Sequence, residues 1–484
     1  MTTENKYGLK VNPYPYQCEG IDFGLKAKRI LIGDQPGLGK TLQSIGIVNA
    51  ADAYPCLVIC PSSLKINWQR EFEKFTDKPA LILDNSVRTS WSYFIQMGLY
   101  KMVVCNYESL RKYFVFDTGK RTGFRLKDVV FTDSVKLFRS VIIDESHRVK
   151  DPSAQQTIFT KGIAEGKPFR ILLSGTPVVN RPADLITQLS IMGRLKHDFG
   201  GKTAFLSRYG GGEKKERGKN EADDQPRNLD ELSQKLYDTC MIRREKAKVL
   251  TQLPAKTRID LYVDIDNAEQ QYRTAANDLA AYLRDYTECT DSDIMRKMRM
   301  EALVKFMTLR SLAAEGKVSQ AIDFVRAFLD SGQQLILFCS LHSVVDRFKQ
   351  AFPDAVTVTG RDSMQAKQAA VDAFQKGEKK LIVCSIKAAG VGLTLTASSN
   401  VAFVELPWTM ADCEQCEDRA HRIGQKDNVT CYYLLGRHTI DSVLYSIVHR
   451  KKTIANQIMA SEDNIPQDEM YFNELVSNFL SQQQ

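Results

Sequence analysis

Short apolar runs alternate with amphipathic stretches through most of the first 200 residues. The segments between the apolar runs, such as LKINWQREFEKF at 64–75, have the apolar spacing of a helix. Strands that alternate with helices predict a mostly parallel sheet covered by helices, with ligands beyond the carboxyl ends of the strands. The predicted strands, which end at polar or Gly/Pro turns, are RILIGD (29–34), CLVIC (56–60), KMVVC (101–105), SVIID (140–144) and RILLS (170–174).

The same alternation returns later and predicts a second α/β lobe over roughly 316–450. Helical segments at 343–352 and 365–377 separate its apolar runs. The predicted strands here are LILFC (335–339), AVTVTG (355–360), KLIVCS (380–385) and NVAFVEL (400–406).

The pattern between the two lobes is different. Residues 229–250 and 265–315 predict helices without strands, which we interpret as insertions from the two lobes. Residues 208–228 are charged, rich in glycine and poor in apolar residues, so they predict an exposed loop that is either solvated or DNA-binding. The last thirty residues predict a helical tail.

Composition adds little to this picture. The 484 residues exceed the roughly 250–300 that one hydrophobic core can serve. The net charge of +8 suits an anionic partner without identifying it. Several of the eleven cysteines lie in apolar runs, and neither a signal peptide nor a membrane-length apolar run is visible. We therefore expect a soluble, intracellular protein.

The first segment with chemical meaning is DQPGLGKT at 34–41, between a predicted strand and a helix. A phosphate-binding loop requires this order, because its amides and the helix N-terminus converge on anionic oxygens. We expect Gly37, Gly39 and Lys40 to bind the phosphates of ATP and Thr41 to bind Mg²⁺. The aspartate that opens the segment stands where the general pattern has glycine. A simple Gly-rich turn is the alternative.

The second segment, SVIIDESH at 140–147, places Asp144 and Glu145 at the carboxyl end of a strand. Asp144 can hold Mg²⁺ through water, and Glu145 can orient or deprotonate the attacking water. A helix N-cap is the alternative for this pair. His147 either couples the ATP site to the inter-lobe cleft or is structural.

The third segment, QCEDRAHRIGQ at 415–425, contains Arg419 and Arg422, which would share one face of a helix. Arginine fingers from a second lobe are expected at such a distance from the phosphate loop, and each can contribute roughly 10³–10⁵ in rate. A solvated basic helix is the alternative. Cys413 and Cys416 have half the spacing of a zinc site, and buried helix cysteines are the simpler interpretation.

Taken together, the segments resemble the ordered motifs of the Snf2 family of superfamily 2 helicase-like ATPases over about residues 13–450. That family also carries aspartate at the start of the phosphate loop. DESH, and SGTP followed by NRPADL, are closest to its annealing-helicase and fork-remodelling branch. The other matching segments are an adenine motif (13–25), motif Ia (60–75), motif Ib (103–110), motif III (172–189), an inter-lobe bridge (241–258), motif IV (335–340) and motif V (385–408).

The resemblance implies two RecA-like parallel-sheet lobes with helical insertions and assigns further residues. Gln17 would recognise adenine. Contacts to DNA phosphates and sugars, which a motor that passes any sequence requires, are implied for Ser62, Ser63, Tyr107, Lys387, Thr394 and Trp408. Packing in a core is the alternative for several of these residues, Trp408 in particular.

The implied function is that of an ATP- and Mg²⁺-dependent translocase on double-stranded DNA, which remodels branched DNA by branch migration or fork regression in replication, recombination or repair. Displacement of proteins from duplex DNA and a non-translocating DNA-binding switch are the alternatives. We expect a monomeric motor without accessory domains, of the kind that bacteria and large DNA viruses encode. The expected segments are 1–195 (lobe 1), 196–256 (helical insertion and bridge), 257–315 (strand and helical protrusion), 316–450 (lobe 2) and 451–484 (tail).

Overall fold

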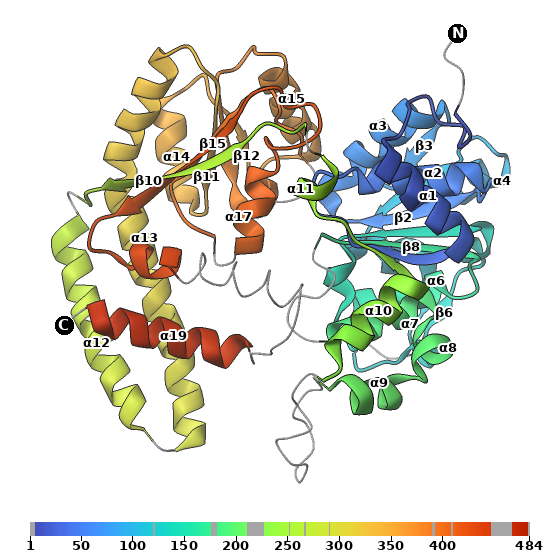
Figure 1. Cartoon of the computed structure of the whole chain (residues 1–484), viewed down its shortest axis with the longest axis horizontal. Helices are drawn as coiled ribbons and strands as arrows, with labels where there is room; N and C mark the ends of the chain where they lie inside the picture. The colour runs from blue at the N-terminus through green and yellow to red at the C-terminus, as the bar shows by residue number, and fades with distance from the viewer. Residues whose placement is uncertain are drawn as a thin grey trace. The chain divides into compact units, whose positions relative to one another are not determined.

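The computed structural model describes residues 5–119, 122–175, 182–210, 227–250, 252–265, 268–289, 291–389, 393–407, 410–446 and 467–482. The chain forms two compact units, Met1–Thr251 with Ser461–Asn464 and Gln252–Ala460 with Ile465–Gln484, here called lobe 1 and lobe 2 (Figure 1). Each lobe contains one parallel sheet, which confirms the predicted α/β architecture. The finer division into five segments remains a prediction.

Lobe 1 is built on a seven-stranded parallel sheet of order β3-β4-β2-β7-β8-β1-β9. Its strands are β1 (Arg29–Ile32), β2 (Cys56–Cys60), β3 (Ala80–Ile82), β4 (Met102–Asn106), β7 (Ser140–Asp144), β8 (Phe169–Leu173) and β9 (Met241–Ile242), and a separate antiparallel hairpin is formed by β5 (Val115–Asp117) and β6 (Val130–Phe131). The helices are α1 (Pro15–Ala27), α2 (Lys40–Ala50), α3 (Lys65–Thr76), α4 (Trp91–Gln96), α5 (Leu110–Phe114), α6 (Gln155–Ala164), α7 (Asp184–Met192), α8 (Leu195–Phe199), α9 (Lys202–Tyr209), α10 (Leu229–Thr239) and α11 (Lys246–Val249). Short 3-10 turns are η1 (Ser62–Leu64), η2 (Tyr107–Ser109), η3 (Leu126–Asp128), η4 (Asp133–Leu137) and η5 (Ser146–Val149).

All five strands predicted for lobe 1 are present, because continuous apolar runs are buried on both faces of a parallel sheet. The prediction that residues 229–250 contain no strand is wrong. Met241 and Ile242 form β9, which pairs with Leu31 and Ile32 at the edge of the sheet. Two residues are too few to show the alternation of apolar and polar positions that predicts a strand. β9 is therefore recognised only by its pairing with β1.

Lobe 2 is built on a six-stranded parallel sheet of order β10-β15-β14-β11-β13-β12. Its strands are β10 (Lys256–Val263), β11 (Leu335–Cys339), β12 (Val356–Val358), β13 (Leu381–Ser385), β14 (Asn400–Phe403) and β15 (Val429–Gly436). Its helices are α12 (Glu269–Glu288), α13 (Ser292–Asp330), α14 (His342–Ala351), α15 (Met364–Gln375), α16 (Ile386–Ala389), α17 (Met410–Glu417) and α19 (Gln467–Gln482). The four predicted strands are present, and β15 is a strand that the sequence interpretation did not include.

The predicted helical protrusion is a pair of long helices, α12 and α13, which lie side by side with α19 against them (Figure 1). α13 continues without a break to Asp330 and packs its later turns on α14 and the sheet. It therefore runs through the segment boundary expected at 315/316. Lys317 anchors it, since its buried ammonium group donates to the carbonyls of Val404 and Leu434 and pairs with Asp441.

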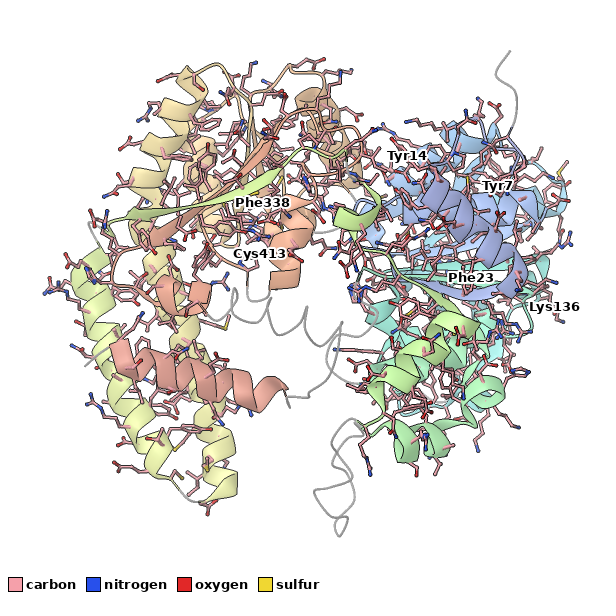
Figure 2. All side chains as sticks on the ribbon, in the orientation of Figure 1. Tyr7, Tyr14, Phe23, Lys136, Phe338 and Cys413 are labelled. Carbon is pink, nitrogen blue, oxygen red and sulfur yellow. The ribbon has the colours of Figure 1, made fainter. Side chains whose placement is uncertain are left out.

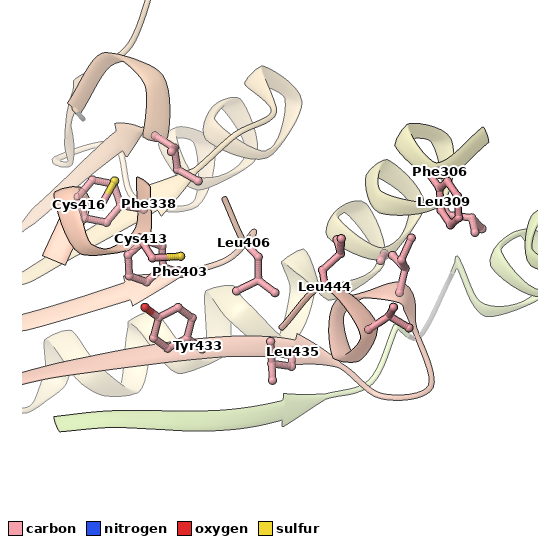
Figure 3. Packing of buried hydrophobic residues seen from close by; sticks show 14 of the residues in the cluster. Phe306, Leu309, Phe338, Phe403, Leu406, Cys413, Cys416, Tyr433, Leu435 and Leu444 are labelled. Atoms are coloured by element: carbon pink, nitrogen blue, oxygen red, sulfur yellow. The ribbon is translucent and has the colours of Figure 1, made fainter. Parts of the chain in front are cut away.

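An aromatic stack in the core of lobe 2 supports the segment that carries the third motif. The rings of Phe338 and Phe403 lie 5.1 Å apart, and those of Phe403 and Tyr433 lie 4.8 Å apart. Cys413 and Cys416 of α17 are fully buried in the same cluster (Figure 3). Their burial agrees with the interpretation as core cysteines, and no cluster of three or more potential metal ligands occurs in the described ranges. Among the same residues, no helix has both the length and the hydropathy to span a membrane.

Candidate active site

The predicted catalytic segments of lobe 1 follow neighbouring strands of one sheet and therefore meet at its carboxyl edge. Along this edge, β4 leads to Tyr107, β2 to Ser62 and Ser63, β7 to Asp144, and β1 to the phosphate loop. β8, between β7 and β1, leads to motif III. The segments expected to contact DNA thus occupy one half of the edge, and those expected to handle ATP occupy the other.

The phosphate loop joins β1 to the N-terminus of α2. Gly37 and Gly39 have φ values of 86° and 73°, in the left-handed region that glycine favours. A Cβ at Gly39 would also lie 2.4 Å from Nε2 of Gln17. The Lys40 ammonium group donates to the carbonyl of Asp34 at 2.7 Å and so folds back over the loop. This is the compact, amide-lined turn that phosphate binding requires.

The adenine motif packs directly on this loop. Gln17 is buried, accepts from the amide of Tyr14 at 2.9 Å, and donates to the carbonyl of Leu38 at 3.1 Å. The Tyr16 hydroxyl donates to the same carbonyl, and Tyr14, which precedes α1 (Figure 2), stacks on Tyr16. Gln17 therefore lies beside the phosphate loop, and its recognition of adenine remains a prediction.

Arg244 is a site residue that the sequence interpretation missed. Its guanidinium group donates to both carboxylate oxygens of Asp34, at 2.8 and 3.1 Å, and to Gln43 at 2.7 Å. It also donates to the carbonyl of Tyr16 and lies over the Tyr16 ring. Asp34 is fully buried, so the aspartate that replaces the usual glycine serves as an anchor for this arginine. The Arg-Arg pair that directly follows β9 was the available signal.

We expect Arg244→Met to lower the free energy of unfolding of lobe 1 by about 1.5–3 kcal/mol, because hydrogen bonds to a buried carboxylate are lost. The KM for ATP should rise about tenfold, equivalent to about 1.4 kcal/mol, since Arg244 no longer joins the adenine motif to the phosphate loop. Urea unfolding followed by tryptophan fluorescence reports mainly on lobe 1, which contains Trp68 and Trp91, two of the three tryptophans. Arg208→Met is the control, because its pair with Glu231 is exposed and worth at most about 1 kcal/mol. Equal effects of the two variants would contradict the role of Arg244 in joining the adenine motif to the phosphate loop.

The Asp-Glu segment has an unusual backbone. Glu145 has a φ of 51°, which is uncommon for a residue other than glycine, and its amide donates to Asp144 Oδ1 at 2.9 Å. Trp68 Nε1 donates to Asp144 Oδ2 at 2.9 Å, and the Tyr107 hydroxyl donates to the Asp144 carbonyl at 2.6 Å. Asp144 is therefore held from three directions while Glu145 is turned away from the strand.

His147 connects motif II to motif III. Its Nδ1 lies 3.1 Å from the hydroxyl of Ser174 and 3.4 Å from Oε2 of Glu145. A Cβ at the adjacent Gly175 would lie 3.8 Å from the Lys40 ammonium nitrogen. Motif III thus lies against both the phosphate loop and the acidic pair, and a coupling role of His147 remains a prediction.

The oxygen donors at this edge are suited to Mg²⁺, a hard cation that is bound through one or two carboxylates together with substrate phosphates. Burial and the charge of Glu145 raise the pKa of Asp144 to about 7. A divalent cation favours the charged carboxylate and offsets this cost. Asp144 and the half-buried Thr41, which begins the first turn of α2, are the residues that would hold it.

The residues expected to contact DNA differ in exposure. Ser62 and Lys387 are exposed, and Ser63 and Thr394 are half-buried. Tyr107 is only 1% exposed, which favours the packing alternative for this residue. Trp408 lies outside the described residues. The DNA contacts as a set remain predictions.

Arg419 and Arg422 do not lie on a helix, because α17 ends at Glu417. They are nevertheless brought together, since both guanidinium groups donate to the carbonyl of Leu393 in motif V, at 3.4 and 3.1 Å. Arg419 is buried and also donates to the carbonyl of Gln415. Motifs V and VI therefore form one unit within lobe 2, and the finger role of the two arginines remains a prediction.

A buried ionic cluster holds this unit on the edge of the sheet. Glu417, which is fully buried, accepts two bonds from Arg258 at 2.6 and 2.7 Å, one from Lys256 at 2.7 Å and one from the Tyr433 hydroxyl at 2.6 Å. Burial alone would raise the pKa of Glu417, but Arg258 and Lys256 lower it to about 2. Side chains of β10 thus hold Glu417, two positions before Arg419 in the third segment.

Glu417→Gln is expected to lower the stability of lobe 2 by about 1.5–3 kcal/mol at pH 7, because the half-buried Lys256 and Arg258 lose their hydrogen bonds to a buried carboxylate. The folded pKa lies below the ordinary value of 4.5, so the stabilisation is complete above about pH 4.5 and is lost as the pH falls towards 2. Urea unfolding at several pH values should show the difference between wild type and variant shrinking below pH 4.5. Glu378→Gln, at a surface pair, should leave the curve unchanged. A difference that persists undiminished at pH 3 would contradict the assignment.

Comparisons with known proteins show the family to which the chain belongs. Residues 16–317 match the SNF2-related domain and residues 316–424 match the helicase conserved C-terminal domain, which fits the predicted enzyme class, a DNA-dependent ATPase. A Caenorhabditis elegans homolog of SWI/SNF-related matrix-associated actin-dependent regulator of chromatin subfamily A-like protein 1 is 31% identical over 93% of this chain and 62% of its own length. The human DNA annealing helicase and endonuclease ZRANB3 is 30% identical over 93% of this chain and 41% of its own length. A Sulfolobus solfataricus SWI2/SNF2 ATPase core, solved in complex with dsDNA, aligns with 99% of this chain and 98% of that one at a TM-score of 0.42 and 21% identity.

Proposed function

Since the chain belongs to the SNF2-related family, we propose that it is an ATP-dependent translocase on double-stranded DNA that remodels branched DNA by branch migration or fork regression. The observation that carries the proposal is the order of loops along one sheet edge, where the ATP-handling segments after β1, β7 and β8 adjoin the segments after β2 and β4. A translocase needs this adjacency, because ATP hydrolysis must change its contacts with the DNA.

The relatives support the branched-DNA substrate. One of them is named as a DNA annealing helicase and endonuclease. The chain spans 62% and 41% of the two relatives' lengths, so the proposal takes from them only the remodelling class of activity.

In the proposed mechanism, Lys40 and the loop amides bind the β- and γ-phosphates of ATP. Thr41 and Asp144 would hold Mg²⁺, which would supply neutralisation of the phosphate charge. Glu145 orients the attacking water and accepts its proton. From lobe 2, Arg419 and Arg422 stabilise charge on the transferring phosphoryl group. Closure and reopening of the lobes with each ATP shift their contacts along the DNA backbone.

The test is the steady-state ATPase rate at fixed low salt without DNA and with single strands, linear duplex or a four-way junction. Salt must be held constant because backbone contacts depend strongly on it. We expect strong stimulation by duplex and a further preference for the junction, followed by junction migration in a strand-exchange assay. Stimulation by duplex without a junction preference would favour displacement of bound proteins. No stimulation by any DNA would refute the translocase.

A further inference from the structure

Asp144 is the point at which the two halves of the sheet edge meet. Its strand, β7, lies between β2, which leads to Ser62 and Ser63, and β8, which leads to motif III. Residues from both segments on the DNA half reach it directly. Trp68, from the helix that follows Ser62 and Ser63, donates to its carboxylate, and Tyr107 donates to its carbonyl.

These two links are short and tightly packed. Trp68 and Tyr107 are each 1% exposed, and Trp68 lies in the first turn of α3, which follows η1 without a break. Closely packed side chains transmit a displacement because they have no free volume in which to absorb it. A shift of η1 therefore reaches the Asp144 carboxylate through the hydrogen bond from Trp68, and a shift of η2 reaches the main-chain carbonyl of Asp144 through the hydrogen bond from Tyr107.

We propose that Trp68 and Tyr107 are positioning residues that couple occupancy of the DNA-contact segments to the orientation of the Asp144 carboxylate. Groups that hold a metal ligand from behind set its geometry, and their loss typically costs 10- to 100-fold in metal affinity or activity. Coupling is reciprocal: DNA tightens binding of the magnesium nucleotide, and the magnesium nucleotide tightens binding of DNA by the same factor. The inference rests on the proposed function and adds to it the residues that connect the DNA-contact segments to the site of the magnesium nucleotide.

The experiment measures the affinity of the whole chain for a fluorescent ADP analogue with Mg²⁺, with and without saturating duplex DNA. For wild type we expect DNA to tighten binding by about tenfold, within the usual range for coupled sites. Trp68→Phe keeps an aromatic ring in the core and removes the N–H donor, so the factor should fall to within about twofold of unity. Tyr107→Phe removes only a hydroxyl group, and it should also lower the factor by which DNA tightens nucleotide binding. Trp91→Phe is the matched control, since Trp91 is also buried in lobe 1 but packs on Phe114 and Phe138.

A second measurement separates positioning from general damage to the fold. In Trp68→Phe the half-saturating Mg²⁺ concentration should rise about 10- to 100-fold, while nucleotide affinity in EDTA stays as in wild type. A wild-type coupling factor in both Trp68→Phe and Tyr107→Phe would overturn the proposal, as would equal losses in Trp68→Phe and Trp91→Phe. The proposal would also be overturned if DNA stimulates the ATPase rate of the wild type but does not change its nucleotide affinity. That result would leave the proposed translocase function unaffected. If DNA does not stimulate the ATPase rate of the wild type at all, the proposed function itself is refuted.

Discussion

Arg422→Ala is expected to lower the DNA-stimulated ATPase rate by about 10³- to 10⁵-fold, the range measured for arginines that stabilise a transferring phosphoryl group. The effect should fall on kcat and leave KM for ATP nearly unchanged, because the contact is made in the transition state. Arg422 is half-buried, and its bond to the Leu393 carbonyl ties it to motif V. Single-turnover and steady-state kinetics at saturating duplex provide the measurement.

Two further variants define what the loss of Arg422 means. Arg422→Lys keeps the charge but not the planar fork of donors, so it should recover only a small part of the rate. Arg437→Ala removes an arginine of the same lobe that pairs with Asp264 at the surface, and should hydrolyse ATP as wild type does. A rate for Arg422→Ala within tenfold of wild type would refute the finger role.

Glu145→Gln is expected to lower the ATPase rate by about 10²- to 10⁴-fold, the usual contribution of general acid–base catalysis. Glutamine has nearly the same shape, but its amide cannot accept the proton of the attacking water. Binding of ATP and of duplex DNA should remain near wild type, because Lys40, Asp34 and Arg244 are unchanged. Phosphate release and nucleotide-binding titrations test both statements on one protein.

The control for this variant is Glu165→Gln, an exposed glutamate at the end of α6 on the same lobe. It should leave both the rate and the binding unchanged. If Glu145→Gln binds ATP tenfold more weakly, the residue serves the ground state and the assignment as general base is wrong.

The sequence alone was sufficient for the features that depend on local pattern. Nine strands were predicted correctly, most of them from unbroken apolar runs, because such runs are typical of strands that are buried on both faces. The phosphate loop and the Asp-Glu pair were also visible, since a ligand beyond the carboxyl end of a strand requires particular residues within a few positions. The family followed from the order of these segments.

Only the tertiary structure revealed the residues that hold these segments in place. Arg244 and Asp34 are separated by 210 positions, and Arg258 and Glu417 by 159, so no local period relates the members of either pair. Trp68 resembled an ordinary apolar helix residue, and its bond to Asp144 spans 76 positions. The two-residue β9 and the end of α17 before Arg419 were equally invisible, because neither leaves a periodic pattern in the sequence. Long-range polar contacts of this kind depend on which chain segments the fold brings together, and a pattern along the chain does not contain that information.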